Sequence, residues 1–128
     1  PPQVLEAMAL PIIHHRTKQF QAIFKEVSEG LQKLFQTTGP VLSIAGSGTT
    51  AFEAAQISLI KPGSKAITVA GGKFGERWQD IYDTYAAYLN IEQIKINADW
   101  GDPAPVDQIE KALKDNPDVS VVCVVHSE

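Results

Sequence analysis

A short glycine-containing turn holds the residues with the clearest chemical potential in this sequence. The turn, residues 46–50, joins an apolar run at residues 41–45 to a segment rich in helix-forming residues. This pattern predicts a strand, a tight turn and the start of a helix. The first amides of a helix lack intrahelical acceptors, and the helix dipole is positive there. A phosphate placed on Ser47, Gly48 and Thr49 would therefore meet free N–H groups and hydroxyls.

Three interpretations of this turn are open on its residues alone. It is a plain strand-to-helix connection, a dinucleotide-binding turn, or a cradle for a cofactor that carries one phosphate. Gly46, Gly48 and Ala51 match the dinucleotide spacing, but that fingerprint also needs an acid after the next strand to hold the ribose. The first acid there is Glu76, which comes too late and weakens this interpretation. A P-loop is excluded because no lysine followed by Ser or Thr comes after the glycines.

The rest of the chain alternates between helix-like and strand-like patterns. Helices are predicted at residues 3–9, 17–36, 49–60, 75–89 and 105–115, and strands at residues 41–45, 65–70, 91–96 and 119–125. Thr17 is the expected cap of the second helix. Four strands that alternate with helices predict an α/β fold with a mostly parallel sheet and flanking helices. Residues 121–125 are apolar at every position, which is typical of a central strand.

Parallel strands bring the turns at residues 46–49, 71–74, 97–101 and 126–128 to one edge of the predicted sheet, where ligands bind in open α/β folds. Phe74 lies in the second turn, between Gly72 and Gly75. We interpret it either as a ring that covers a ligand or as a loop aromatic that folds into the core. Arg77 and Trp78, which follow, are interpreted as packing or interface residues.

Composition limits the classes of function. The chain has 128 residues and a formal net charge of -4, and no basic face with interleaved aromatics predicts a nucleic-acid partner. No signal peptide and no apolar run of bilayer length are visible, so we expect a cytoplasmic protein that does not enter a membrane. The single cysteine, Cys123, is predicted to be buried in a strand. The adjacent His14 and His15 point to opposite faces of an extended segment, so no metal site is expected.

Three motifs together resemble the class V aminotransferases. They are AGSGTTAFEAA at residues 45–55, GGKFGER at residues 71–77 and VVHSE at residues 124–128. The branch that they resemble comprises the alanine-glyoxylate, serine-glyoxylate and serine-pyruvate aminotransferases, and some similar sequences are labelled soluble hydrogenase small subunit. The resemblance covers essentially the whole chain.

The resemblance implies a fold and a set of cofactor contacts. It implies that residues 1–128 are the N-terminal part of the large domain of a fold type I transferase, without an internal domain boundary. This fold binds pyridoxal 5'-phosphate (PLP). Ser47, Gly48 and Thr49 would hold the phosphate, and Phe74 would lie flat on the pyridine ring, where many relatives have Trp.

The resemblance also implies an activity for the parent protein. An amino group would pass between a small amino acid, alanine or serine, and a small 2-oxo acid, glyoxylate or pyruvate. The family's Schiff-base lysine and the acid that pairs with the pyridine nitrogen lie beyond residue 128. No catalytic residue is therefore assigned in this chain, and the fragment is expected to be inactive alone. The expected partners are the two substrates, the rest of the parent chain and a second copy in a homodimer.

The hydrogenase label implies an alternative function. On this alternative the chain is part of a non-enzymatic subunit of a redox complex. One cysteine cannot hold an iron–sulfur cluster, which argues against an electron-transfer centre in these residues. His14, His15, Arg16 and His126 are given no role.

Overall fold

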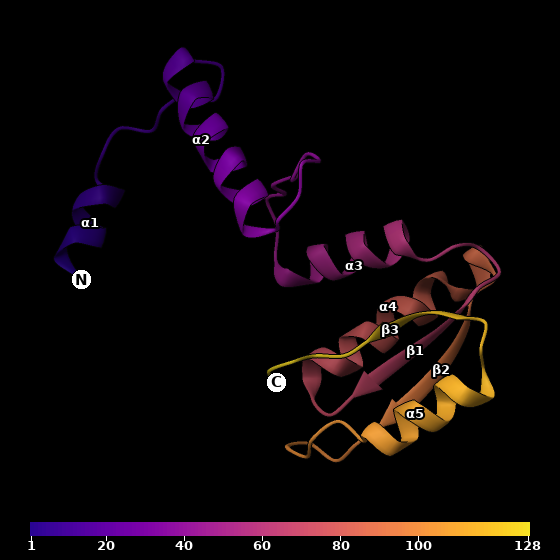
Figure 1. The fold of residues 1–128 in the computed structure, drawn as a ribbon. Coiled ribbons are helices and arrows are strands. Elements are labelled where there is room, and N and C mark those ends of the chain that lie inside the picture. Colours follow the sequence, from indigo (N-terminus) through magenta and orange to yellow (C-terminus); the bar gives the residue numbers. More distant parts are fainter. The chain divides into compact units, whose positions relative to one another are not determined.

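The computed structural model describes residues 1–128, which form two compact units, Pro1–Ser43 and Ile44–Glu128. The first unit contains α1 (Pro2–Met8) and α2 (Lys18–Leu34) (Figure 1). The interpretation of residues 1–128 as one partial domain stays a prediction.

The helix α2 is amphipathic and starts at the predicted cap. The hydroxyl of Thr17 accepts a hydrogen bond from the amide of Phe20 at 3.2 Å, which satisfies one free amide of the first turn. No residue of α2 is buried, and Phe24 and Leu34 are 46% and 73% exposed. None of the helices in the chain is both long and apolar enough to cross a lipid bilayer.

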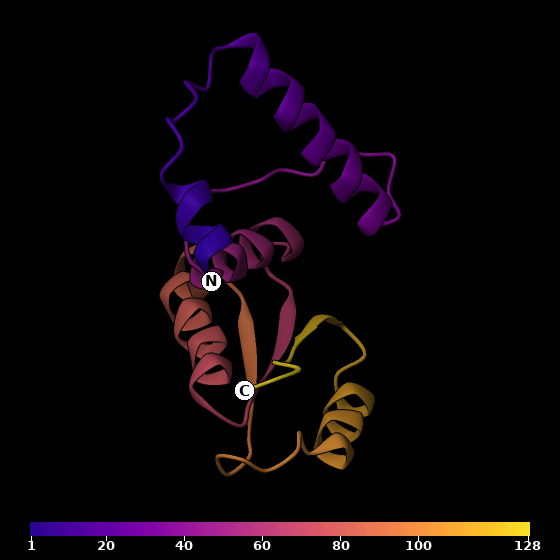
Figure 2. The same cartoon turned by 90° about the vertical axis from the view of Figure 1, so that its left-hand side faces the viewer.

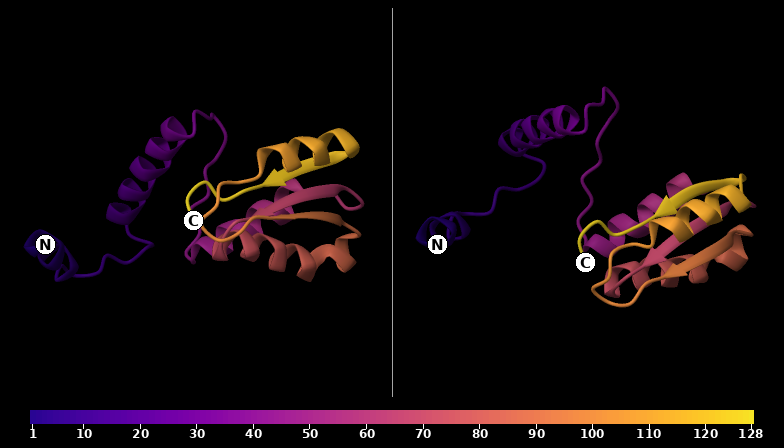
Figure 3. Two further views of the ribbon diagram at one scale, coloured as in Figure 1. Left: turned by 90° about the horizontal axis from the view of Figure 1, so that it is seen from below. Right: turned by 60° about the horizontal axis from the view of Figure 1, so that its bottom comes forward.

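The second unit is an α/β structure. Its elements are α3 (Gly48–Leu59), β1 (Lys65–Ala70), α4 (Lys73–Leu89), β2 (Glu92–Asn97), α5 (Val106–Asp115) and β3 (Val119–Cys123). The three strands form a parallel sheet in the order β2-β1-β3. The helix α4 covers one face of this sheet and α5 covers the other (Figures 2 and 3). The predicted α/β fold with a parallel sheet and flanking helices is confirmed.

The central strand β1 contributes to the core on both of its faces. On the α4 face, Ala66 packs in a cluster with Tyr82 and Cys123. On the α5 face, Ile67 and Val69 pack in a second cluster. Because successive side chains of a strand point to opposite faces, one short strand links the two halves of the core. Cys123 is buried as predicted, and this burial raises the pKa of its thiol.

The predicted strand at residues 41–45 is wrong. The segment has no regular secondary structure, and Leu42 and Ile44 are 80% and 61% exposed. A strand forms only where a neighbour accepts and donates its backbone hydrogen bonds, and no segment of this chain pairs with these residues. The sheet therefore has three strands rather than four.

The predicted position of the last strand is also wrong. The strand β3 is at the edge of the sheet, and β1 is at the centre. Regular pairing of β3 ends at Cys123, and Val122 and Val124 are 37% and 49% exposed. An apolar run indicates that a segment prefers a sheet, but it does not determine which strands lie beside it.

The start of α4 lies unusually close to the end of β1. A Cβ atom at Gly75 would lie 2.7 Å from the Cα atom of Ala70 and 2.9 Å from the carbonyl oxygen of Val69. Both atoms belong to the backbone of β1, so neither moves aside without a shift of the strand or the helix. The absence of a side chain at Gly75 therefore permits this packing.

We expect Gly75→Ala to destabilise the protein by about 1–3 kcal/mol, because the added methyl group overlaps the backbone of β1. The measurement is urea unfolding. Gly30→Ala is the matched control, because a Cβ atom at Gly30 in α2 meets nothing within 4 Å. That substitution should be neutral or stabilise by about 0.5–1 kcal/mol. Equal stability of the two variants would contradict the close packing of α4 on β1.

Candidate functional site

The helices α3 and α4 lie side by side and start at the same end of the unit (Figure 1). Near this end, a guanidinium nitrogen of Arg77 donates to the hydroxyl of Thr49 at 3.0 Å. One turn further along, the rings of Phe52 and Trp78 stack with centroids 4.3 Å apart. The amide of Gln56 donates to the carbonyl of Trp78 at 3.1 Å. These contacts fix the first turn of α3 next to the first turns of α4.

The first turn of α3 presents unused polar groups to open space. Ser47 precedes the helix with an extended backbone (φ -81, ψ 172), and its hydroxyl makes no cap hydrogen bond. The amides of Gly48 and Thr49, in the first turn, have no carbonyl within the helix to which they can donate. A Cβ atom at Gly48 would meet nothing within 4 Å. An anion can therefore approach these amides directly, and the helix dipole favours it.

Arg77 adds a positive charge beside this turn, whereas its place in the sequence indicated only a packing or interface residue. Its positively charged guanidinium lies at the start of α3, where it donates to Thr49. The two residues are 28 positions apart on different helices. Nothing in the local pattern distinguishes this arginine from a surface charge, so only the packing of α3 on α4 reveals it.

Phe74 is the second residue of α4 rather than a residue of the preceding turn. Its side chain is 57% exposed, so the alternative that the ring folds into the core is wrong. The amides of Phe74 and Gly75 donate to the two carboxylate oxygens of Glu128, at 3.1 Å and 2.6 Å respectively. The ring of Phe74 thus lies at the carboxyl edge of the sheet, and the hydrogen bonds to Glu128 hold the backbone that carries it.

A third group of polar contacts surrounds Glu76, which is in the first turn of α4. Its carboxylate accepts from Lys73 at 2.8 Å and from the indole N–H of Trp100 at 3.1 Å. The hydrogen bond to Lys73 lowers the pKa of Glu76, and the same bond raises the pKa of Lys73. A nucleophilic lysine must be neutral, so this pairing disfavours Lys73 as a nucleophile.

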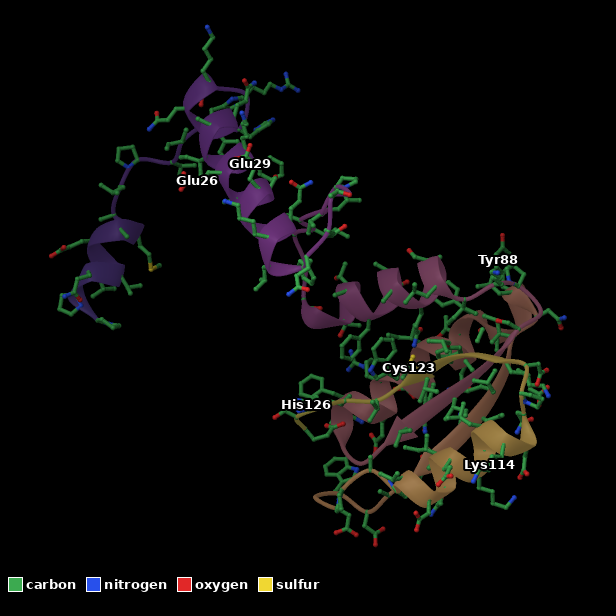
Figure 4. The ribbon with its side chains drawn as sticks, viewed as in Figure 1. Glu26, Glu29, Tyr88, Lys114, Cys123 and His126 are labelled. Carbon is green, nitrogen blue, oxygen red and sulfur yellow. The ribbon has the colours of Figure 1, made fainter.

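The turns that follow the strands meet at this edge, as the parallel sheet predicts. The amide of Gly101 donates to the carbonyl of Gly71 at 3.3 Å, and that of Ala98 donates to Ala70 at 2.8 Å. A recess of about 390 Å³ opens between the turns. His126, one of the residues that line it, is exposed (Figure 4). The recess is lined by Gly71, Gly101, Asp102, Pro103, Ala104, Val125, His126 and Glu128.

Comparison with curated proteins identifies relatives for the whole chain, although no family model matches it. The chain is 39% identical over 128 residues to an uncharacterized aminotransferase of Methanocaldococcus jannaschii, and covers 32% of that protein. It is 37% identical to the soluble hydrogenase 42 kDa subunit of Anabaena cylindrica, with 100% of the chain and 33% of that protein covered. It is 33% identical to the alanine–glyoxylate aminotransferase of Mus musculus, with 99% of the chain and 30% of that protein covered.

Solved structures share the fold. The pyridoxamine–pyruvate aminotransferase of Mesorhizobium loti matches 97% of the chain and 31% of its own length with a TM-score of 0.80 at 22% identity, which shows the fold alone. The alanine–glyoxylate aminotransferase of a Nostoc species matches with a TM-score of 0.77 at 27% identity, over 100% of this chain and 33% of its own.

These matches define the class of protein to which the chain is related. The fold is shared with aminotransferases. The relatives include proteins that are named as serine–glyoxylate and alanine–glyoxylate aminotransferases. The resemblance predicted from the three sequence motifs is confirmed, including the relatives that are named as soluble hydrogenase subunits. The chain spans about a third of the length of the curated relatives that it matches.

The contact between Arg77 and Thr49 is testable without any ligand. We expect Arg77→Met and Thr49→Val to show a coupling free energy of about 0.5–1.5 kcal/mol in a double-mutant cycle, because each removes one partner of the same charge-assisted hydrogen bond. Urea unfolding of the four proteins gives this value. A parallel cycle of Arg77→Met with Thr84→Val is the control, because the hydroxyl of Thr84 bonds within its own helix. Additive effects in both cycles would contradict the contact.

Proposed function

We propose that this chain is the cofactor-holding part of a PLP-dependent aminotransferase of class V. One observation carries the proposal: the hydrogen bond between Arg77 and Thr49 holds an open helix start with unused amides next to α4, whose first turn carries the exposed Phe74 at the carboxyl edge of the parallel sheet. Relatives that are named as aminotransferases and match 100% and 99% of this chain support it. Activity belongs to the full-length parent protein.

The start of α3 fits the phosphate of PLP. A phosphate monoester needs several hydrogen-bond donors and a positive potential. The amides of Gly48 and Thr49 and the hydroxyl of Ser47 supply donors that the fold does not use elsewhere. The charge of Arg77 adds to the potential of the helix start. In this proposal these residues bind the phosphate and leave the rest of the cofactor free to face the substrate.

Phe74 fits the aromatic ring of the cofactor. A flat heteroaromatic ring gains from stacking on an aromatic side chain, and Phe74 presents an exposed ring at the correct edge of the sheet. Stacking there would orient the cofactor and exclude water from one of its faces. PLP, when bound, acts as an electron sink for the bond that breaks in an amino acid.

The proposed reaction is transfer of an amino group from a small amino acid to a small 2-oxo acid. Relatives named serine–glyoxylate and alanine–glyoxylate aminotransferase support serine or alanine as donor and glyoxylate as acceptor. Pyruvate is the alternative acceptor in this proposal. The remainder of the parent chain would supply the catalytic lysine, and a second copy would complete a homodimer. The 128-residue chain would therefore be inactive alone.

A second candidate function rests on the relatives that are named soluble hydrogenase subunits, which are 37% and 35% identical to this chain. In this second candidate function, the full-length parent protein is a non-enzymatic subunit of a redox complex. The full-length protein as purified distinguishes the two functions. The aminotransferase should absorb in the near-ultraviolet and violet, with a band that shifts when alanine is added. Co-purifying iron without such a band, and without amino transfer, would favour the redox subunit.

Gly48→Arg should abolish retention of PLP by the full-length protein, with a loss of affinity of more than about 100-fold, because the side chain fills the space in front of the free amides. The fold should survive, since a Cβ atom at Gly48 meets nothing within 4 Å. Equilibrium dialysis against PLP measures the affinity. Gly30→Arg places the same side chain at an open position of α2 and should leave the affinity unchanged. Unchanged affinity of Gly48→Arg would remove the phosphate assignment.

Phe74→Ala should weaken PLP binding by about 1–3 kcal/mol, because the stacking surface is lost. Phe74→Trp, which keeps a flat ring, should retain most of the affinity. The dissociation constant and the circular dichroism of the cofactor band both report this change. If Phe74→Ala binds PLP as the unaltered protein does, the ring faces something other than the cofactor.

A further inference from the structure

We propose that Glu128 is a positioning residue for Phe74: its carboxylate holds the first turn of α4, and with it the aromatic ring that faces the cofactor. This inference rests on the proposed function. Glu128 follows β3, whereas Phe74 follows β1, so the contact joins two turns that are 54 positions apart in sequence. We derive it from the hydrogen bonds of the carboxylate, the space that it occupies and the exposure of the ring.

Both carboxylate oxygens are engaged with the start of α4. One oxygen, Oε2, accepts from the amide of Phe74 at 3.1 Å, and Oε1 accepts from the amide of Gly75 at 2.6 Å. These amides belong to the first turn of the helix, where the backbone has no acceptor of its own. Gly72, the residue that precedes the helix, has no side chain with which to cap it. Glu128 supplies the missing cap from another segment, and its negative charge is favoured by the helix dipole.

Two glycines leave the space that the carboxylate fills. A Cβ atom at Gly72 would lie 2.6 Å from Oε2 of Glu128 and 2.7 Å from its Cδ atom. A Cβ atom at Gly75 would lie 3.0 Å from Oε1. Any larger residue at Gly72 would push the carboxylate away from the two amides. Gly72 and Gly75 therefore leave the space that the carboxylate of Glu128 occupies.

The exposure of Phe74 makes this anchor relevant to function. Its ring is 57% exposed, so packing in the core contributes little to its orientation. The direction of the ring therefore depends on the backbone of the first turn of α4, and the two hydrogen bonds that its amides donate to Glu128 hold that backbone. Loss of the carboxylate would leave the side chain of Phe74 unaltered, but it would allow the first turn of α4, and with it the ring, to move.

A double-mutant cycle in the full-length protein tests whether Glu128 acts through Phe74. We expect Glu128→Gln to weaken PLP binding about tenfold, because the amide group replaces one acceptor with a donor that faces a backbone N–H. In the Phe74→Ala background, the same substitution should change the affinity by less than about twofold, because there is no ring left to position. Equal losses in the two backgrounds would overturn the proposal.

Glu110→Gln is the matched control for the cycle. Glu110 is an exposed carboxylate on α5 that pairs with Lys114 on its own helix, so its substitution removes the same charge away from the turn. It should leave PLP binding unchanged in both backgrounds. The circular dichroism of the bound cofactor adds a spectroscopic reading: Glu128→Gln should reduce the band at saturating PLP, whereas Glu110→Gln should not.

Hydrogen exchange separates this inference from the proposed function. Glu128→Gln should speed exchange of the amides of Phe74 and Gly75 about tenfold or more, while amides of α5 keep their protection. Unchanged exchange at these two amides would overturn the anchor, whether or not the protein binds PLP. If the unaltered protein binds no PLP, the proposed function fails, and the exchange experiment still decides whether Glu128 holds the turn of Phe74.

Discussion

The packing of α4 on β1, backbone against backbone at Gly75, determines where the candidate residues lie. Any side chain at this position would overlap Ala70 and Val69, so the helix can start at the end of the strand only because the residue is glycine. This contact places the first turn of α4 at the carboxyl edge of the sheet, with Phe74 directed outward. The contacts of the edge then form around α4: Arg77 reaches α3, and the amides of the first turn meet Glu128.

Local sequence patterns predicted the elements well where each element is defined by its own residues. The strand β1 has the predicted bounds, and the ends of the helices lie within two residues of the prediction. The two errors concern pairing. Residues 41–45 have a strand-like composition but no neighbour, and β3 has the composition of a central strand but lies at the edge. Neighbours in a sheet are set by contacts between distant segments, which hydrophobic periodicity does not encode.

The candidate site divides in the same way. The glycine turn and Phe74 could be identified from sequence because glycines, and an aromatic residue close to glycines, are local signals. Arg77 and Glu128 could not, because each is a polar residue whose partner lies 28 or more positions away. In the sequence they look like ordinary surface charges. Only the assembled packing shows that one of them adds charge to the start of α3 and that the other caps the start of α4.

Three glycines of the site serve to leave space rather than to adopt an unusual backbone conformation. The glycines with positive φ are Gly63 and Gly101, which are not among these three. At Gly48 the space is open to a ligand, at Gly72 it is filled by the carboxylate of Glu128, and at Gly75 it is filled by the backbone of β1. In the proposed function, such a site would bind its ligand largely through backbone amides, which every residue type has. Its preference for a phosphate and a flat ring would then depend on where side chains are absent as much as on those that are present.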